Sequence, residues 1–151
     1  MRTVNDILES KPQPFNTLAP DRLVIDALHM LNSVNLSYLI VMDGADYKGL
    51  FSERDYSRNV VLKGRSSSST TVQEVMTTDL PLVGPNDSVE QCIALINLHK
   101  TRYLLACNEA DKVVGVITIH DLLRQVINYR GEFDNTALAE QLIDQDERNV
   151  Y

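Results

Sequence analysis

The sequence predicts a mixed α/β (α+β) protein that contains two pseudo-symmetric copies of one small unit. Residues 18–42 align with residues 83–107 at an offset of 65 positions, and self-similarity at a fixed spacing indicates a repeat architecture. In both copies, apolar residues with helical spacing precede two short strand-like runs. Each unit is therefore expected to form a small β-sheet with two helices, in the order β-α-β-β-α.

The two copies match through a helix, a hairpin and the start of a second helix. After one inserted residue the offset becomes 66, and residues 48–61 align with residues 114–127. The matched pairs are Pro20 and Pro85, Val24 and Val89, Leu31 and Ile96, Asn32 and Asn97, Tyr38 and Tyr103, Leu39 and Leu104, Gly49 and Gly115, Ser52 and Thr118, and Asp55 and Asp121.

Each element of the unit has its own sequence signal. A hairpin is predicted at residues 38–42 and 48–51, and again at 103–107 and 113–117, because turn-forming residues separate each pair of runs. The second helix begins at Ser52 or Thr118. The first helix is predicted by apolar residues at positions i, i+3, i+4 and i+7, which are Val24, Ala27, Leu28 and Leu31, then Val89, Cys92, Ile93 and Ile96. A short apolar lead precedes each copy: Val4, Ile7 and Leu8, then Val72, Val75 and Met76.

The chain divides at a Ser/Thr-rich stretch. Residues 1–65 hold the first unit, residues 66–71 a connector, residues 72–130 the second unit, and residues 131–151 an acidic tail with helical spacing of apolar residues. The composition of the connector is typical of a flexible linker. One unit of about 60 residues buries too little surface to be secure alone. We therefore expect the two units to pack on each other around a pseudo-two-fold axis.

Composition and charge narrow the classes of function. The 151 residues include 14 Lys and Arg against 21 Asp and Glu, a formal net charge of -7, so a general attraction to nucleic acid or anionic lipid is not expected. The longest apolar stretch is far shorter than the roughly 20 residues of a membrane helix, and the N-terminus lacks a signal-peptide core. We expect a cytoplasmic protein that binds neither nucleic acid nor membrane.

The cysteines and histidines form no metal-ligand or catalytic pattern. Cys92 and Cys107 show no CxxC spacing, and we expect them to be buried thiols in a reducing compartment. His29 and His99 lie within predicted helices. His120, at a helix start, has a structural interpretation and an interpretation as a base. We predict no metal site and no catalytic residue.

The junction between each hairpin and the following helix reads Gly-x-x-Ser/Thr-x-x-Asp, as GLFSERD and GVITIHD. Ser or Thr followed three residues later by a carboxylate is a capping box, which satisfies N–H groups of the helix start. The same helix start can hold a phosphate through its N–H groups, its dipole and the hydroxyl. The carboxylate can accept hydrogen bonds from a ribose diol. A hydroxyl and a carboxylate one helical turn apart therefore suit a nucleotide.

Together with the repeat and the leads, these junctions resemble a pair of cystathionine-β-synthase (CBS) domains, also called a Bateman module, over residues 4–130. The resemblance implies two CBS units packed as one module, with adenosine ligands such as AMP, ADP, ATP, NAD or S-adenosylmethionine in two clefts between the repeats. It also implies a homodimer that regulates a partner protein in trans and does not catalyse a reaction. AMP is the foremost ligand, and no catalytic cofactor is implied.

The resemblance also assigns nucleotide-binding roles. Ser52 and Thr118 contact phosphate, and Asp55 and Asp121 bind ribose. In this family the lead of one repeat faces the junction of the other. One cleft is therefore expected to contain Thr17, Tyr38 and Asp121, and the other Val83, Arg102, Tyr103 and Asp55.

Four basic residues lie within twelve positions after the start of the first junction helix: Arg54, Arg58, Lys63 and Arg65. A solvated helix face is one interpretation. Contact with a ligand phosphate is the other, since a guanidinium matches phosphate geometry. Arg54 and Arg58 are favoured for phosphate contact because they lie in the first turns of the helix.

Three functions are consistent with these observations. The first is a non-catalytic adenine-nucleotide sensor that signals by changing the geometry of a dimer. The second is a ligand-independent interaction scaffold in which the junction motifs are only helix caps. The third is a nucleotide hydrolase that uses Asp55 or Asp121, although the sequence offers no second carboxylate or metal-ligand set nearby.

Overall fold

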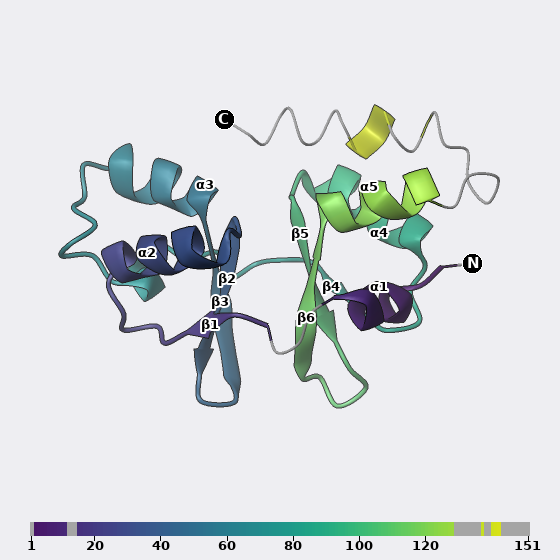
Figure 1. Cartoon of the computed structure of the whole chain (residues 1–151), viewed down its shortest axis with the longest axis horizontal. Coiled ribbons are helices and arrows are strands. Elements are labelled where there is room, and N and C mark those ends of the chain that lie inside the picture. Colours follow the sequence, from purple (N-terminus) through teal and green to yellow (C-terminus); the bar gives the residue numbers. More distant parts are fainter. Residues whose placement is uncertain (1, 12–14, 129–136, 138–139, 143–151) are drawn as a thin grey trace. The chain divides into compact units, whose positions relative to one another are not determined.

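The computed structural model describes residues 2–11, 15–128, 137 and 140–142. The chain forms two compact units, whose elements are labelled in Figure 1. The continuous unit is Pro14–Asp79, and the split unit combines Met1–Gln13 with Leu80–Tyr151. The predicted mixed α+β fold is confirmed, with one three-stranded sheet in each unit.

The continuous unit contains a sheet in the order β1-β2-β3. β1 runs parallel to β2, and β2 and β3 form the predicted antiparallel hairpin. The second helix of this repeat is a single α-turn that continues as a π-helix, although the sequence predicts a regular helix. The elements are β1 (Thr17–Leu18), α2 (Val24–Val34), β2 (Tyr38–Asp43), β3 (Asp46–Ser52), α3 (Glu53–Asp55), the π-helix η1 (Tyr56–Val61) and the 3-10 turn η2 (Val72–Glu74).

The split unit repeats this plan with a sheet in the order β4-β5-β6. The same register shift interrupts both hairpins, between Val41 and Met42 and between Ala106 and Cys107, so the repeats share a bulge as well as a topology. The elements are α1 (Val4–Ser10), β4 (Leu82–Val83), α4 (Val89–His99), β5 (Tyr103–Cys107), β6 (Val113–Thr118) and α5 (Ile119–Asn128).

Each lead packs in the compact unit of the other repeat. The docking uses backbone hydrogen bonds at matching positions, just before the first helix of the repeat that receives the lead. These bonds are Val4 N to Asp87 O (2.9 Å) and Asn5 N to Pro85 O (2.9 Å) in the split unit, and Val72 N to Arg22 O (2.8 Å) and Gln73 N to Pro20 O (3.0 Å) in the continuous unit. The compact units therefore divide after residues 13 and 79, whereas the sequence repeats divide at the Ser/Thr-rich stretch.

The Ser/Thr-rich stretch belongs to the continuous unit. Leu23, the N-cap of α2, makes no side-chain cap hydrogen bond. Instead, Thr70 O accepts from Val24 N at 2.8 Å, and Ser67 O accepts from Ile25 N at 2.9 Å. These contacts satisfy two N–H groups that a helix start leaves without an intrahelical partner. The composition predicts a flexible linker, whereas the structure uses the stretch to cap α2.

Each unit has its own apolar core. Phe51, fully buried, is part of the cluster in the continuous unit, together with Val72 of the second lead. In the split unit, Ile7 of α1 and Leu142 of the C-terminal segment are both 1 % exposed and lie in one cluster with the sheet and the helices. Most of the tail predicted at residues 131–151 lies outside the described residues, which are helical at residues 137 and 140–142. Among the described helices, none is both long and apolar enough to cross a membrane.

Candidate functional site

Both junction motifs lie where the last strand of a sheet runs into the following helix. Ser52 ends β3 and is the N-cap of α3, and Thr118 ends β6 directly before α5. In the hairpin register, Tyr38 lies opposite Ser52 and Tyr103 opposite Thr118. The fold therefore places a tyrosine of the neighbouring strand opposite the hydroxyl residue of each motif.

At the first junction, the carboxylate of Asp55 is almost completely enclosed. Its Oδ2 accepts hydrogen bonds from Ser52 N (2.9 Å) and Ser52 Oγ (3.1 Å), and its Oδ1 accepts one from Thr77 Oγ1 (2.7 Å). Asp55 is 6 % exposed. Burial raises the pKa of its carboxyl, and the hydrogen bonds from Thr77 and Ser52 oppose this effect.

The second junction keeps the capping box but changes the third contact. Asp121 Oδ2 accepts from Thr118 N at 2.9 Å, and Thr118 Oγ1 accepts from Asp121 N at 3.1 Å. Lys11 Nζ forms an ion pair with Asp121 Oδ2 at 2.8 Å and also donates to Val116 O at 2.8 Å. The first lead therefore contacts the capping oxygen of Asp121 with a lysine ammonium, whereas the second lead contacts the other oxygen of Asp55 with the Thr77 hydroxyl.

The glycine of each motif allows the lead to approach the junction. A Cβ at Gly49 would lie 2.7 Å from Met76 Sδ and 2.8 Å from Thr77 O. A Cβ at Gly115 would lie 2.8 Å from Leu8 Cδ2. Real Cβ contacts are essentially never this short. Gly49 therefore packs against the backbone of the second lead and Gly115 against the flexible end of Leu8 in the first lead, and neither glycine has a positive φ.

Thr3 and Asp6 form the same capping box at the start of α1, without the burial. Asp6 Oδ2 accepts from Thr3 N at 2.9 Å and from Thr3 Oγ1 at 3.1 Å, the same distances as at Asp55. The hydrogen bonds from Thr3 lower the pKa of Asp6, whereas burial raises the pKa of Asp55. Capping therefore explains the local geometry of the junctions, and the burial of their carboxylates goes together with the further contacts from Thr77 and Lys11.

The other residues that the resemblance assigns lie in both units. Thr17 is exposed on β1, and Tyr38 is half-buried on β2 of the continuous unit. In the split unit, Val83 and Tyr103 are buried, Val83 within the core cluster. The carbonyl of Arg102 accepts the first N–H of α5 at 3.1 Å. The arrangement of these residues in two clefts stays a prediction.

The four basic residues after the first junction separate by exposure. Arg54 and Arg58 are half-buried, and Lys63 and Arg65 are exposed. Arg65 Nη1 donates to the carbonyl of Glu74 at 3.4 Å, which ties it to the second lead. Arg54 and Arg58 stay the candidates for phosphate contact.

Lys11 and Thr77 were not among the predicted site residues. Each lies far along the chain from its carboxylate, by 110 positions for Lys11 and Asp121 and by 22 positions for Thr77 and Asp55. The only sequence signal is a polar residue shortly after the apolar part of each lead. That signal is common to most helix ends and does not identify a partner.

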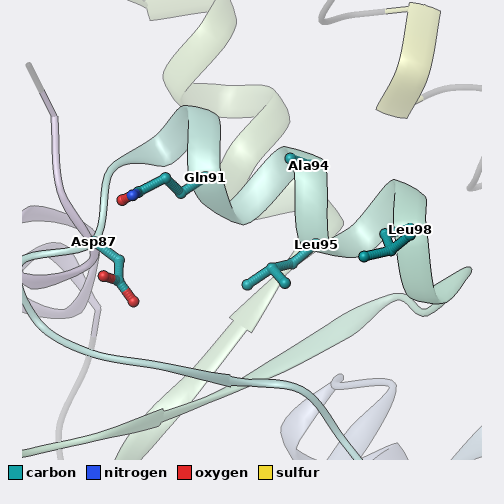
Figure 2. A pocket seen from close by; sticks show the side chains of 5 residues that line it. All are labelled: Asp87, Gln91, Ala94, Leu95 and Leu98. Atoms are coloured by element: carbon teal, nitrogen blue, oxygen red, sulfur yellow. The ribbon is translucent and has the colours of Figure 1, made fainter.

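A groove of about 340 Å³ lies along α4 in the split unit (Figure 2). No predicted site residue lines it, and no His, Cys, Asp or Glu cluster suited to a metal occurs in the described part of the chain. The groove is lined by Asp87, Gln91, Ala94, Leu95 and Leu98.

The chain is similar to known CBS-domain proteins in sequence and in structure. Residues 72–128 match the family model of the CBS domain. A CBS-domain protein of Burkholderia ambifaria is 37 % identical with a TM-score of 0.79, over 85 % of this chain and 96 % of that one. The mitochondrial CBS domain-containing protein CBSX3 of Arabidopsis thaliana is 27 % identical over 139 residues, which are 86 % of this chain and 67 % of that protein. CBSX2 in complex with AMP shares the fold, with a TM-score of 0.68, 24 % identity and coverage of 83 % of this chain and 96 % of that chain.

Proposed function

Because the chain belongs to the CBS-domain family, we propose that it is a non-catalytic regulatory protein that binds an adenine nucleotide. AMP is the first candidate, and ADP, ATP and NAD are alternatives. The nucleotide changes the geometry of a homodimer, which signals to a partner protein in trans. The proposed location is the cytoplasm, which cell fractionation tests.

The observation that carries this proposal is the burial of a carboxylate at each junction. Asp55 is 6 % exposed and Asp121 is 8 % exposed, whereas the capping box at Thr3 and Asp6 has the same cap geometry without this burial. Burying a carboxylate is costly, so a role beyond capping is supported at the two junctions. Binding of AMP by CBSX2, a protein of the same fold, supports a nucleotide as the ligand.

Each junction residue takes a definite role in this proposal. Ser52 and Thr118 contact phosphate at a helix start, where N–H groups and the helix dipole favour an anion. Asp55 and Asp121 accept hydrogen bonds from ribose. Arg54 and Arg58 add phosphate contacts at the first junction. The cleft walls are Thr17 and Tyr38 with Asp121, and Val83, Arg102 and Tyr103 with Asp55.

Calorimetric titration of AMP, ADP, ATP and NAD into the protein tests the proposal. A hydrogen bond to a charged group is worth about 1.5 to 3 kcal/mol, so Asp55→Asn should weaken binding at its cleft roughly ten- to a hundredfold. Asp6→Asn is the matched control, because it alters the same kind of capping box away from the junctions. Equal weakening by both variants would assign the effect to capping, and unchanged binding in a folded Asp55→Asn would remove the ribose role.

The homodimer has its own measurement. Light scattering at micromolar protein, with and without AMP, should give the mass of two chains in both states, because the proposed signal is a change of geometry. A monomeric mass would contradict the dimer and leave nucleotide binding intact.

A ligand-independent scaffold is the second candidate, and the hydrogen bonds at Asp55 favour it. Both oxygens of that carboxylate already have donors, from Ser52 and Thr77, so the motif is complete as a structural element. Three further capping boxes begin at Thr3, Thr71 and Ser88. Absence of a calorimetric signal with all four nucleotides would support the scaffold.

A further inference from the structure

The two junctions share their residues and differ in the group that the lead presents to the carboxylate. At the first junction, Asp55 Oδ1 accepts from the hydroxyl of Thr77 at 2.7 Å. At the second, Asp121 Oδ2 forms an ion pair with Lys11 at 2.8 Å. One lead therefore supplies a neutral donor and the other a cation.

Apart from Lys11 and Thr77, the matched positions within and one turn after the two motifs carry the same total formal charge. At the positions between hydroxyl and carboxylate, Glu53 and Arg54 carry opposite charges, and their counterparts Ile119 and His120 are neutral when His is counted as neutral. One turn further on, both helices carry an arginine, Arg58 and Arg124. Among these positions, Lys11 is therefore the one charge that the second junction has and the first lacks.

Lys11 makes two close contacts at this site and is only partly exposed. Its Nζ contacts both Val116 O and Asp121 Oδ2 at 2.8 Å. Its side chain is 22 % exposed, whereas the surface pair Arg22 and Asp26 has side chains 54 % and 41 % exposed. Salt screens a partly buried pair much less than a surface pair, so the charge of Lys11 persists at this site.

The second carboxylate also keeps an acceptor. Within the described part of the chain, Asp121 Oδ2 receives the donors at this site, from Thr118 and Lys11, and Oδ1 receives none. At the first junction both oxygens of Asp55 receive donors. Asp121 is thus able to accept a ribose hydroxyl while its negative charge is balanced, so a nearby phosphate is not repelled.

We propose that Lys11 is a specificity-determining residue, which makes the Thr118–Asp121 junction prefer a phosphorylated nucleoside to the unphosphorylated one. At the Ser52–Asp55 junction the lead presents the neutral Thr77 hydroxyl to the carboxylate instead, and this junction shows a weaker preference. This inference rests on the proposed nucleotide binding and assigns unequal ligand preferences to the two sites. A unit charge about 4 Å from another in water-like surroundings changes affinity about fivefold, and more in a less polar site.

The test is a site-resolved NMR titration of the full ¹⁵N-labelled chain with AMP and with adenosine. The backbone amides of Thr118 and Ser52 report the two junctions separately. The measured quantity is the ratio of the adenosine Kd to the AMP Kd at each amide. Lys11→Thr and Thr77→Lys exchange the two lead residues, and Lys11→Met keeps most of the aliphatic stem in case the shorter side chain disturbs folding.

In the wild type, we expect the ratio at Thr118 to exceed the ratio at Ser52 about fivefold or more. Lys11→Thr or Lys11→Met should abolish this excess with little change for adenosine, and Thr77→Lys should create it at Ser52. An unchanged ratio in both Lys11 variants would overturn the inference. An equal gain in affinity for AMP and for adenosine in these variants would also overturn it, because Lys11 would then compete with ribose for Asp121. If neither ligand moves either amide, the proposed nucleotide binding itself fails and this inference fails with it.

Discussion

Replacing Gly49 by Ala should loosen the second lead from the first junction. Leu50 N donates to Thr77 O at 2.9 Å, and Thr77 N donates to Leu50 O at 2.8 Å. An alanine Cβ at position 49 would lie 2.8 Å from that same Thr77 oxygen and 2.7 Å from Met76 Sδ. The backbone of the lead must therefore move, and the Thr77 hydroxyl that binds Asp55 moves with it.

The matched substitution in the other repeat, Gly115→Ala, provides the comparison for the cost of Gly49→Ala. Overpacking a close contact costs about 1 to 3 kcal/mol, and a lost backbone hydrogen bond adds about 1 kcal/mol. We expect Gly49→Ala to lower the free energy of unfolding by about 2 to 4 kcal/mol. At Gly115 the obstacle is Leu8 Cδ2, the end of a flexible side chain, so Gly115→Ala should cost about 1 kcal/mol.

Thermal unfolding followed by circular dichroism checks the comparison. For a chain of this length, 1 kcal/mol shifts Tm by about 2 to 4 °C, so the two variants should differ by several degrees. The stability cost of Gly49→Ala should be only partly reduced when it is measured in a Met76→Ala background, relative to Met76→Ala alone. Equal losses at Gly49 and Gly115 would refute the reasoning, and full recovery would show that the thioether and not the backbone carbonyl is the obstacle.

Three further predictions concern buried groups. Burial raises the pKa of Asp55 above 3.8, so the unfolded state loses this proton first and the free energy of unfolding falls as pH rises through the raised pKa. Asp55→Asn should flatten this part of the plot of unfolding free energy against pH, measured by urea unfolding. An unchanged slope of that plot would contradict the raised pKa. Leu142→Ala should cost about 2 to 5 kcal/mol in a thermal melt, whereas Leu98→Ala, at a side chain 73 % exposed, should cost little; equal effects would show that Leu142 is not part of the core. Burial raises the pKa of Cys92 to about 12, so a thiol reagent should modify the half-buried Cys107 first and Cys92 only on unfolding; equal rates would refute the burial.

Local patterns in the sequence determined the repeat, the hairpins and the helix starts. The spacing of apolar residues from Val24 to Leu31 indicates that one face of this helix is buried, whichever element that face packs against. Ser52 and Asp55 cap a helix through groups three residues apart, so the motif alone predicts this local geometry. These features depend on neighbours in the chain, which the sequence shows directly.

Longer contacts decided the details of the first junction helix. In η1, Leu62 N donates to Ser57 O at 3.1 Å, a π-type spacing that no local signal predicts. Asn59 Nδ2 reaches Val75 O of the second lead at 3.0 Å. The matching Gln125 in α5 receives instead a hydrogen bond from the side chain of Arg2 at 3.4 Å, and α5 is a regular α-helix. The two repeats therefore diverge where different leads contact them.

The family resemblance implies that each lead faces the junction of the other repeat, and only the tertiary structure shows which contacts this exchange brings about. α1 docks by donating backbone N–H groups to backbone carbonyls before α4, and the second lead uses the matching carbonyls before α2. Backbone carbonyls are chemically alike, so hydrogen bonding by itself does not tell a lead which repeat to join. In the exchanged arrangement, Leu8 lies at Gly115 and Met76 lies at Gly49. This arrangement brings Lys11 to Asp121, 110 positions away, and so sets the charge of one junction through a contact that no local pattern in the sequence contains.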